Sequence, residues 1–249
     1  MAATLTIRHL TLGEGTPKII VPIVGKTAQE ILPAAQAIAA HPHADLVEWR
    51  ADHYEHALNV EETCAMLQSL RAVLEDKPLL YTFRTAHEGG KKAIEAAQYT
   101  ALCGTVAASG QADLIDVEMF SPAADACVHG IHAHHVPVVG SWHDFTQTPA
   151  ERDLLSRFRA MQQEGADVLK IAVMPQCLED VTHLISAAKA MHKEALKPLC
   201  AMSMGDTGRI TRTHCQHFGG CMTFGALGTA SAPGQVDVDT LYAVLREGC

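Results

Sequence analysis

From residue 18 onward, short apolar runs alternate with longer alanine-rich segments in which apolar residues recur at the helical period. The short runs are rich in β-branched side chains, which is typical of buried parallel strands. Strands that alternate with helices indicate βαβ units built on a parallel sheet. The pattern predicts eight such units. The expected strands lie near Ile19–Val24, Leu46–Arg50, Leu79–Arg84, Leu114–Glu118, Pro137–Trp142, Val168–Val173, Leu199–Met204 and Cys221–Phe224.

A helix is expected after each strand, and two helices have recognisable start signals. Thr148 and Pro149 fit an N-cap followed by a first-turn proline, and Asp237 fits the cap of the last helix. The expected helices span residues 27–40, 59–74, 91–109, 122–134, 149–164, 178–192, 210–217 and 238–247.

Eight βα units in 249 residues favour a closed (β/α)₈ TIM barrel, of class α/β, over an open doubly wound sheet. An open dinucleotide-binding sheet would carry G-x-G-x-x-G after its first strand, whereas residues 24–29 hold one glycine. Before the first unit, residues 5–12 alternate apolar and polar side chains and then turn at Gly13-Glu-Gly15, which predicts a β-hairpin arm. Without a linker or repeat, residues 1–249 are expected to form a single domain.

Composition narrows the class of ligand. The chain is 48% hydrophobic and 19% charged, and its formal net charge is −9. An acidic globular protein offers no general attraction to nucleic acid or to anionic membranes, so an anionic ligand must be bound by local arginines. The sequence has no secretion signal and no apolar stretch of about 18 residues. Its eight cysteines include no C-x-x-C pair. We therefore expect a cytoplasmic protein with reduced thiols.

Lys170 stands in the middle of the apolar run 167–175. A buried ammonium without a partner is unfavourable and tends to lose its proton, and a neutral amine is a nucleophile toward carbonyls. Lys170 is therefore a candidate for Schiff-base formation. The structural alternative is a lysine that pairs with a buried carboxylate such as Glu118, or one whose ammonium reaches solvent.

In a TIM barrel the active site lies at the C-terminal ends of the strands, and polar residues collect at those positions here. Lys170 could form an imine with a ketone, His143 could move a proton at the adjacent carbon, and Glu88 could orient the imidazole. The guanidinium groups of Arg50 and Arg212 could bind a carboxylate or hydroxyls. The charged and polar residues at the strand ends include Glu48, Arg50, Arg84, Glu88, Asp116, Glu118, His143, Lys170, Arg209, Arg212 and the loop Ser231–Gln235.

Several recognisable segments run along nearly the whole chain. The most informative are Glu48-Trp-Arg-Ala-Asp-His53, Lys77-Pro-Leu-Leu-Tyr-Thr-Phe-Arg84, Ser141-Trp-His-Asp-Phe145, Lys170-Ile-Ala-Val-Met-Pro175 and Ala230-Ser-Ala-Pro-Gly-Gln235. Together they resemble type I 3-dehydroquinate dehydratase of the shikimate pathway, which leads to chorismate and the aromatic amino acids. The His-Asp-Phe and Ser-Ala-Pro-Gly-Gln segments resemble this family in particular.

The resemblance implies a lyase that converts 3-dehydroquinate to 3-dehydroshikimate by syn elimination through a lysine Schiff base. It makes Lys170 the imine-forming lysine, His143 the general acid/base and Glu88 its neighbouring carboxylate. It further implies a barrel closed at its base by the N-terminal hairpin, a homodimer, and no metal or organic cofactor. The substrate-binding residues that it implies are Glu48, Arg50, Arg84, Arg212, Ser231 and Gln235.

Three features depart from this interpretation or compete with it. Pro22 replaces a first-strand serine of the relatives, which removes an expected hydroxyl contact to the ligand. A class I aldolase would also need a lysine on a barrel strand, but Arg212 with Gln235 favours carboxylate over phosphate recognition. A metal site is a third alternative because His214, Cys215 and His217 lie close in sequence, with Cys221 beyond, although this spacing matches no common zinc pattern.

Overall fold

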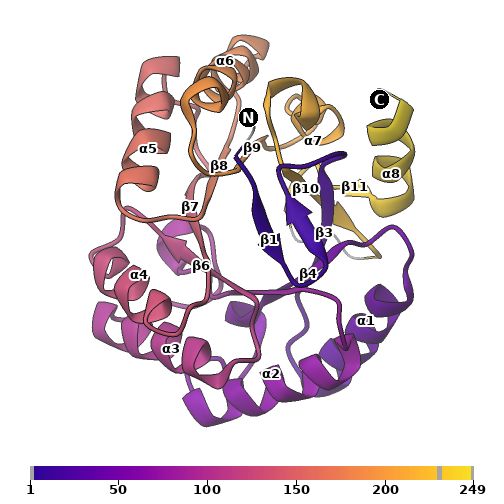
Figure 1. The fold of residues 1–249 in the computed structure, drawn as a ribbon, viewed down its shortest axis with the longest axis vertical. Helices are drawn as coiled ribbons and strands as arrows, with labels where there is room; N and C mark the ends of the chain where they lie inside the picture. Colours follow the sequence, from indigo (N-terminus) through magenta and orange to yellow (C-terminus); the bar gives the residue numbers. More distant parts are fainter. Residues whose placement is uncertain (1–2, 229–231, 248–249) are drawn as a thin grey trace.

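The computed structural model describes residues 3–228 and 232–247, and it has the expected TIM-barrel-like α/β fold (Figure 1). Parallel strands follow one another around the barrel in the order β10-β3-β4-β5-β6-β7-β8-β9. Between β9 and β10 the sheet closes through one bridge, Leu199 with Gly220, where the Cys221 amide donates to the Leu199 carbonyl at 2.8 Å. The strands are β3 (Lys18–Ile23), β4 (Leu46–Arg50), β5 (Leu79–Thr82), β6 (Leu114–Glu118), β7 (Val138–Asp144), β8 (Val168–Val173), β9 (Leu199–Ser203) and β10 (Met222–Ala226).

Strand boundaries differ from the prediction by one or two residues at β3, β5, β7, β9 and β10, and one further strand was not predicted. β5 ends at Thr82, before the expected Arg84, whose amide turns toward Asp52 Oδ1 at 3.4 Å. β7 continues to Asp144 because it pairs with β8 over six successive residues. A short strand, β11 (Val236–Asp237), was not predicted and pairs with the end of β10.

Helices surround the barrel, one after each strand (Figure 1). The predicted cap at Asp237 is confirmed, since its carboxylate accepts from the Asp239 amide at 3.0 Å. The predicted cap at Thr148 is wrong: α5 begins at Glu151, and the Thr148 hydroxyl instead donates to the Met174 carbonyl at 3.0 Å. The helices are α1 (Ala28–Ala40), α2 (Val60–Leu74), α3 (Ala96–Ser109), α4 (Ala124–His132), α5 (Glu151–Gln163), α6 (Leu178–Glu194), α7 (Ile210–Thr213) and α8 (Val238–Glu247), with 3-10 turns η1 (Ala51–His53), η2 (Ala86–Glu88) and η3 (Cys215–Phe218).

The N-terminal hairpin covers the base of the barrel, as predicted. Its strands β1 (Leu5–Ile7) and β2 (Leu10–Leu12) pair antiparallel, and Leu12 is fully buried. The apolar hairpin residues pack in one cluster with side chains from the starts of the barrel strands, including Leu46, Leu114 and Val168. The hairpin therefore fills the N-terminal end of the barrel interior. None of the helices in the described part of the chain is long and apolar enough to span a bilayer.

Candidate active site

A cavity of about 380 Å³ lies at the C-terminal ends of the strands and brings together nearly all of the predicted site residues. β4, β7 and β8 carry Glu48, His143 and Lys170, while Arg212 comes from α7. Ser231 lies outside the described residues. Pro22 does not line the cavity, whereas Val24, just beyond the same strand, does. The predicted residues that line it are Glu48, Arg50, Arg84, Glu88, His143, Lys170, Arg212 and Gln235.

Lys170 is held among carboxylates inside the barrel, where it is 3% exposed. Its Nζ lies 3.2 Å from Asp116 Oδ2 and 3.6 Å from Glu48 Oε1. The Phe224 ring lies against the same ammonium, with its centroid 4.6 Å away. Glu118 is therefore not its partner, and the ammonium does not reach solvent. The amine instead faces the cavity with two carboxylates beside it.

Asp116 connects Lys170 to a second cation. Its Oδ1 lies 2.6 Å from Arg84 Nη2 and accepts from the Ser141 hydroxyl at 2.7 Å. Burial raises the pKa of Asp116, but Arg84 and Lys170 outweigh this effect and lower the pKa below its usual value. Because side chains alternate along a strand, the sequence already placed Asp116 on the same face of β6 as Glu118. Its contact with Lys170, on another strand, became visible only in the structure.

Arg84 is surrounded by acidic groups. Besides Asp116, its guanidinium contacts Glu118 at 3.2 Å and Glu88 at 3.4 Å. Burial lowers the pKa of Arg84, but these carboxylates raise it well above the ordinary value. The predicted substrate-binding arginine therefore lines the cavity while protein carboxylates already engage it. Through Asp116 and Glu88 it also joins Lys170 to His143.

His143 and Glu88 form the expected pair. His143 Nδ1 lies 2.9 Å from Glu88 Oε2, and the His143 amide donates to the same oxygen at 3.0 Å. Burial, followed by Arg84 and Lys170, lowers the pKa of His143 well below 6.5. Burial also raises the pKa of Glu88 to about 8, although Arg84 opposes this change. The imidazole is therefore neutral at ordinary pH, and because Nδ1 is engaged, proton exchange with a ligand falls to Nε2.

Arg212 differs from the other cations of the cavity. It is 2% exposed, and no carboxylate in the described ranges lies within 4.0 Å of its guanidinium. Its Nη1 and Nη2 contact Met202 Sδ at 3.4 Å and the Pro233 carbonyl at 3.3 Å, while its buried Nε has no hydrogen-bond partner among the residues that the structure describes. Burial lowers the pKa of Arg212 to about 10. Arg50, in contrast, binds Asp52 through two bonds of 2.8 and 2.9 Å. Arg212 is therefore prepared to receive an anion.

Some cavity residues escaped the sequence argument because they are apolar or lie in irregular loops. Met202, Met204 and Phe224 form an apolar wall, and His53 and Lys91 come from loops. Met202, Met204 and Phe224 lie on or just after barrel strands, so the rule that the site gathers at the C-terminal ends of the strands could have found them.

Two other features of the sequence do not contribute to the cavity. Arg209 is exposed outside it, and His214, Cys215 and His217 do not form a metal-ligand group in the described chain.

Fold and site together define a TIM-barrel protein with a buried, strand-borne lysine beside a neutral histidine, an arrangement suited to chemistry on a carbonyl compound. The sequence profile of the type I 3-dehydroquinase family matches residues 19–247. The chain belongs to the type I 3-dehydroquinase family.

Individual relatives agree over the full length. A 3-dehydroquinate dehydratase from Bacillus licheniformis is 44% identical, with 99% of this chain and 98% of the relative covered, and one from Clostridium kluyveri is 43% identical with the same coverage. Among solved structures, a type I 3-dehydroquinate dehydratase from Clostridium difficile with covalently modified comenic acid superposes with a TM-score of 0.95 at 41% identity. That superposition covers 99% of this chain and 98% of the other.

Proposed function

We propose that this protein is a hydro-lyase that converts 3-dehydroquinate to 3-dehydroshikimate, as the names of its relatives state for them. One observation carries the assignment: a buried lysine, a neutral histidine and an arginine without a carboxylate partner line the same cavity. The substrate carries the matching groups, which are a ketone, an acidic C–H beside it and a carboxylate. The family match favours this reaction over an aldolase.

Lys170 supplies the nucleophile. After the Lys170 ammonium has given up one proton within the site, its amine adds to the C3 ketone. The same proton joins the carbinolamine hydroxyl, which leaves as water, and the cationic iminium that remains draws electrons from the neighbouring C2–H bond. Asp116 at 3.2 Å and Glu48 at 3.6 Å lie beside the nitrogen that carries this charge. In a buried site, these carboxylates stabilise the developing cation without solvent reorganisation.

His143 moves the proton. Its neutral Nε2 takes the proton from C2, and the resulting enamine expels the C1 hydroxyl, which accepts the same proton and leaves as water. Water then hydrolyses the conjugated iminium, which releases 3-dehydroshikimate and restores the Lys170 amine. Glu88, 2.9 Å from Nδ1, orients the imidazole so that Nε2 is left for this proton. One histidine on one face of the ring accounts for a syn elimination.

Arg212 binds the substrate carboxylate, since its guanidinium fork matches that group and has no internal counter-ion among the described residues. Gln235 and Ser231 add hydrogen bonds from the loop after β10. Glu48, Arg50 and Arg84 complete the polar wall, which binds the substrate hydroxyls.

Trapping of the imine tests the proposal. Borohydride added with product should reduce the imine and leave a mass adduct on the peptide that contains Lys170. Lys170→Ala should lose both the adduct and the appearance of enoate absorbance from 3-dehydroquinate, whereas Lys189→Ala, at an exposed position of α6, should retain both. An adduct on another lysine would contradict the assignment.

We further propose that the protein acts as a homodimer in the cytoplasm. The resemblance to its family supports the dimer, and the acidic composition with scattered cysteines fits a reducing compartment. Light scattering coupled to gel filtration should give twice the 26.7 kDa chain mass. A mass of one chain at micromolar concentration would exclude the dimer.

A further inference from the structure

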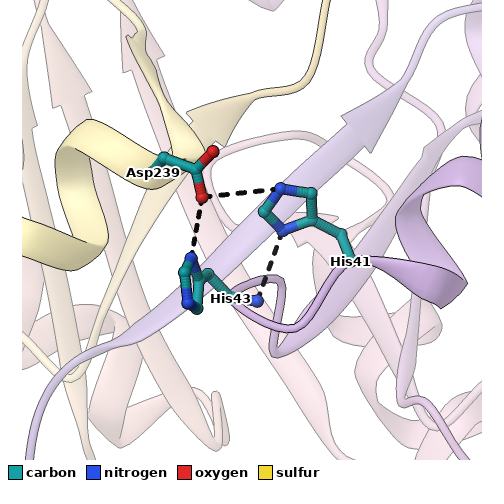
Figure 2. A group of neighbouring side chains, drawn as sticks. All are labelled: His41, His43 and Asp239. Carbon is teal, nitrogen blue, oxygen red and sulfur yellow. Dashed lines mark hydrogen bonds and ion pairs between the residues drawn. The ribbon is translucent and has the colours of Figure 1, made fainter.

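Three side chains with metal-ligand chemistry meet where the end of α1 approaches α8 (Figure 2). His41 follows the last residue of α1, His43 lies in the loop to β4, and Asp239 lies in the first turn of α8. None of them lines the active-site cavity, and the proposed reaction uses none of them. Within residues 3–228 and 232–247, no other three His, Cys, Asp or Glu side chains have this spacing.

The geometry is close to that of a metal site. Asp239 Oδ1 lies 2.7 Å from His43 Nδ1 and 3.6 Å from His41 Nε2, and all three ligand atoms lie within 4.8 Å of one another. Ligands about 2.0–2.1 Å from a tetrahedral zinc ion are about 3.3 Å apart, and the two observed distances bracket this value. A small shift of the Asp239 carboxylate, whose side chain is 66% exposed, would even out these two distances. The two imidazole nitrogens lie within 4.8 Å of each other and would draw together around the ion.

Neighbouring residues restrict the motion of both imidazoles before an ion binds. The His43 ring stacks on Tyr242 of α8, with centroids 3.6 Å apart and planes 10° from parallel. The His41 side chain is 17% exposed, and Pro42 restricts the backbone between the two histidines. Little conformational freedom would therefore be lost when an ion binds.

One contact must change when the ion binds. His41 Nδ1 accepts a hydrogen bond from the His43 amide at 3.3 Å. When Nε2 coordinates a metal, Nδ1 carries the ring proton, and this contact then opens. A bond at 3.3 Å is at the weak end of the range for N–H donors, so the loss is small.

We propose that His41, His43 and Asp239 bind one divalent transition-metal ion, with water in the remaining position. Two imidazoles and a carboxylate match the ligand preferences of zinc. The ion would link the first and last helices of the barrel, and its role is structural because it lies apart from the cavity.

Zinc titration of the full-length chain, first freed of metal with a chelator, tests the proposal. Calorimetry should show one Zn²⁺ bound per chain, and zinc should raise the Tm. His43→Ala and Asp239→Asn should each weaken this binding by at least about tenfold and remove the Tm increase. His134→Ala and Asp125→Asn, at exposed positions elsewhere, serve as matched controls and should behave as the unmodified chain. Turnover of 3-dehydroquinate should be the same in all four variants.

Cobalt distinguishes this site from the thiols, of which Cys177 is exposed. Co²⁺ bound by nitrogen and oxygen ligands gives visible d–d bands, whereas a thiolate ligand adds a strong near-ultraviolet charge-transfer band. We expect d–d bands alone, and we expect them to be lost in His43→Ala. Absence of zinc binding, equal affinity in His43→Ala, or a thiolate band that persists in that variant would each overturn the proposal.

Discussion

Burial of Arg212 is unfavourable for the fold but, in the proposed function, favourable for recognition. A buried guanidinium with no carboxylate partner among the described residues destabilises the fold, and its lowered pKa, about 10, reflects the same burial. In the proposed complex, the substrate carboxylate would remove this penalty. Arg212 would then stabilise the complex at the expense of the empty protein.

Arg212→Ala should weaken binding of 3-dehydroquinate by roughly 2–5 kcal/mol, because the substrate carboxylate then lacks its partner in a buried site. Arg212→Lys should recover only part of the affinity, since an ammonium cannot form two parallel bonds to a carboxylate. Calorimetric titration with the product measures the effect. Arg209→Ala, three residues earlier and exposed, is the control.

Arg212→Met should raise the free energy of unfolding while it removes substrate binding. An apolar side chain of similar length packs against Met202 without a buried charge, so the unfavourable burial of an unpaired guanidinium is removed. Urea denaturation monitored by circular dichroism gives the comparison. A less stable variant would show that the contacts with Met202 and Pro233 outweigh the burial of the charge.

His143 should titrate below pH 6.5 in the free protein. Burial, Arg84 and Lys170 disfavour the imidazolium, so the folded-state pKa is lower than the unfolded one. The base form therefore persists as the pH falls through 6.5 and is lost only further down. NMR titration of the imidazole measures this pKa, and the exposed His134 provides an internal reference. A His143 midpoint above that of His134 would contradict the electrostatic account.

At the scale of elements, the N-terminal hairpin β1–β2 covers the base of the barrel, and its contribution to the free energy of unfolding can be measured. Leu12 is fully buried, and truncation of such a side chain removes about 2–5 kcal/mol of unfolding free energy. Leu12→Ala should lose an amount in this range, whereas Leu196→Ala, at a position 77% exposed, should change stability by about 0.5 kcal/mol or less. Urea denaturation of the two variants gives the comparison, and equal stabilities would mean that the hairpin merely rests on the barrel.

Sequence periodicity predicted the elements well because the two kinds of element have different apolar patterns in this fold. The buried strands are short continuous apolar runs, whereas the helices have apolar residues at the helical period. All eight barrel strands and the hairpin were expected, and the strand-end rule brought Lys170, His143 and Arg212 to one mouth. A predicted strand boundary was wrong where a side chain distant in sequence binds the backbone. β5 ends before Arg84, whose amide donates to the Asp52 carboxylate, and no local sequence pattern reveals this contact. Pairings inside the site, such as Asp116 with Lys170, depend on barrel closure and were not predictable.

At the scale of the whole molecule, the pairing of neighbouring barrel strands in the described chain is weakest between β9 and β10. β7 and β8 pair over six successive residues, whereas β9 and β10 meet at the single bridge between Leu199 and Gly220. Local opening should begin where the fewest hydrogen bonds cross. Native-state hydrogen exchange followed by mass spectrometry should therefore show faster exchange in peptides from 199–203 and 222–226 than in 168–173. Uniform protection across these peptides would indicate that the barrel opens as one unit.

The hairpin that fills the base also has a consequence for how the chain is made. Its apolar residues leave the ribosome before the barrel strands, yet they share a cluster with Met222, which is synthesised some 210 residues after Leu12. Contacts this distant in sequence form slowly, because a long loop must close before they stabilise anything. The cluster around Ile7, Leu10 and Leu12 therefore stays incomplete until nearly the whole barrel is translated. Until then these side chains leave apolar surface exposed on the nascent chain, which favours aggregation.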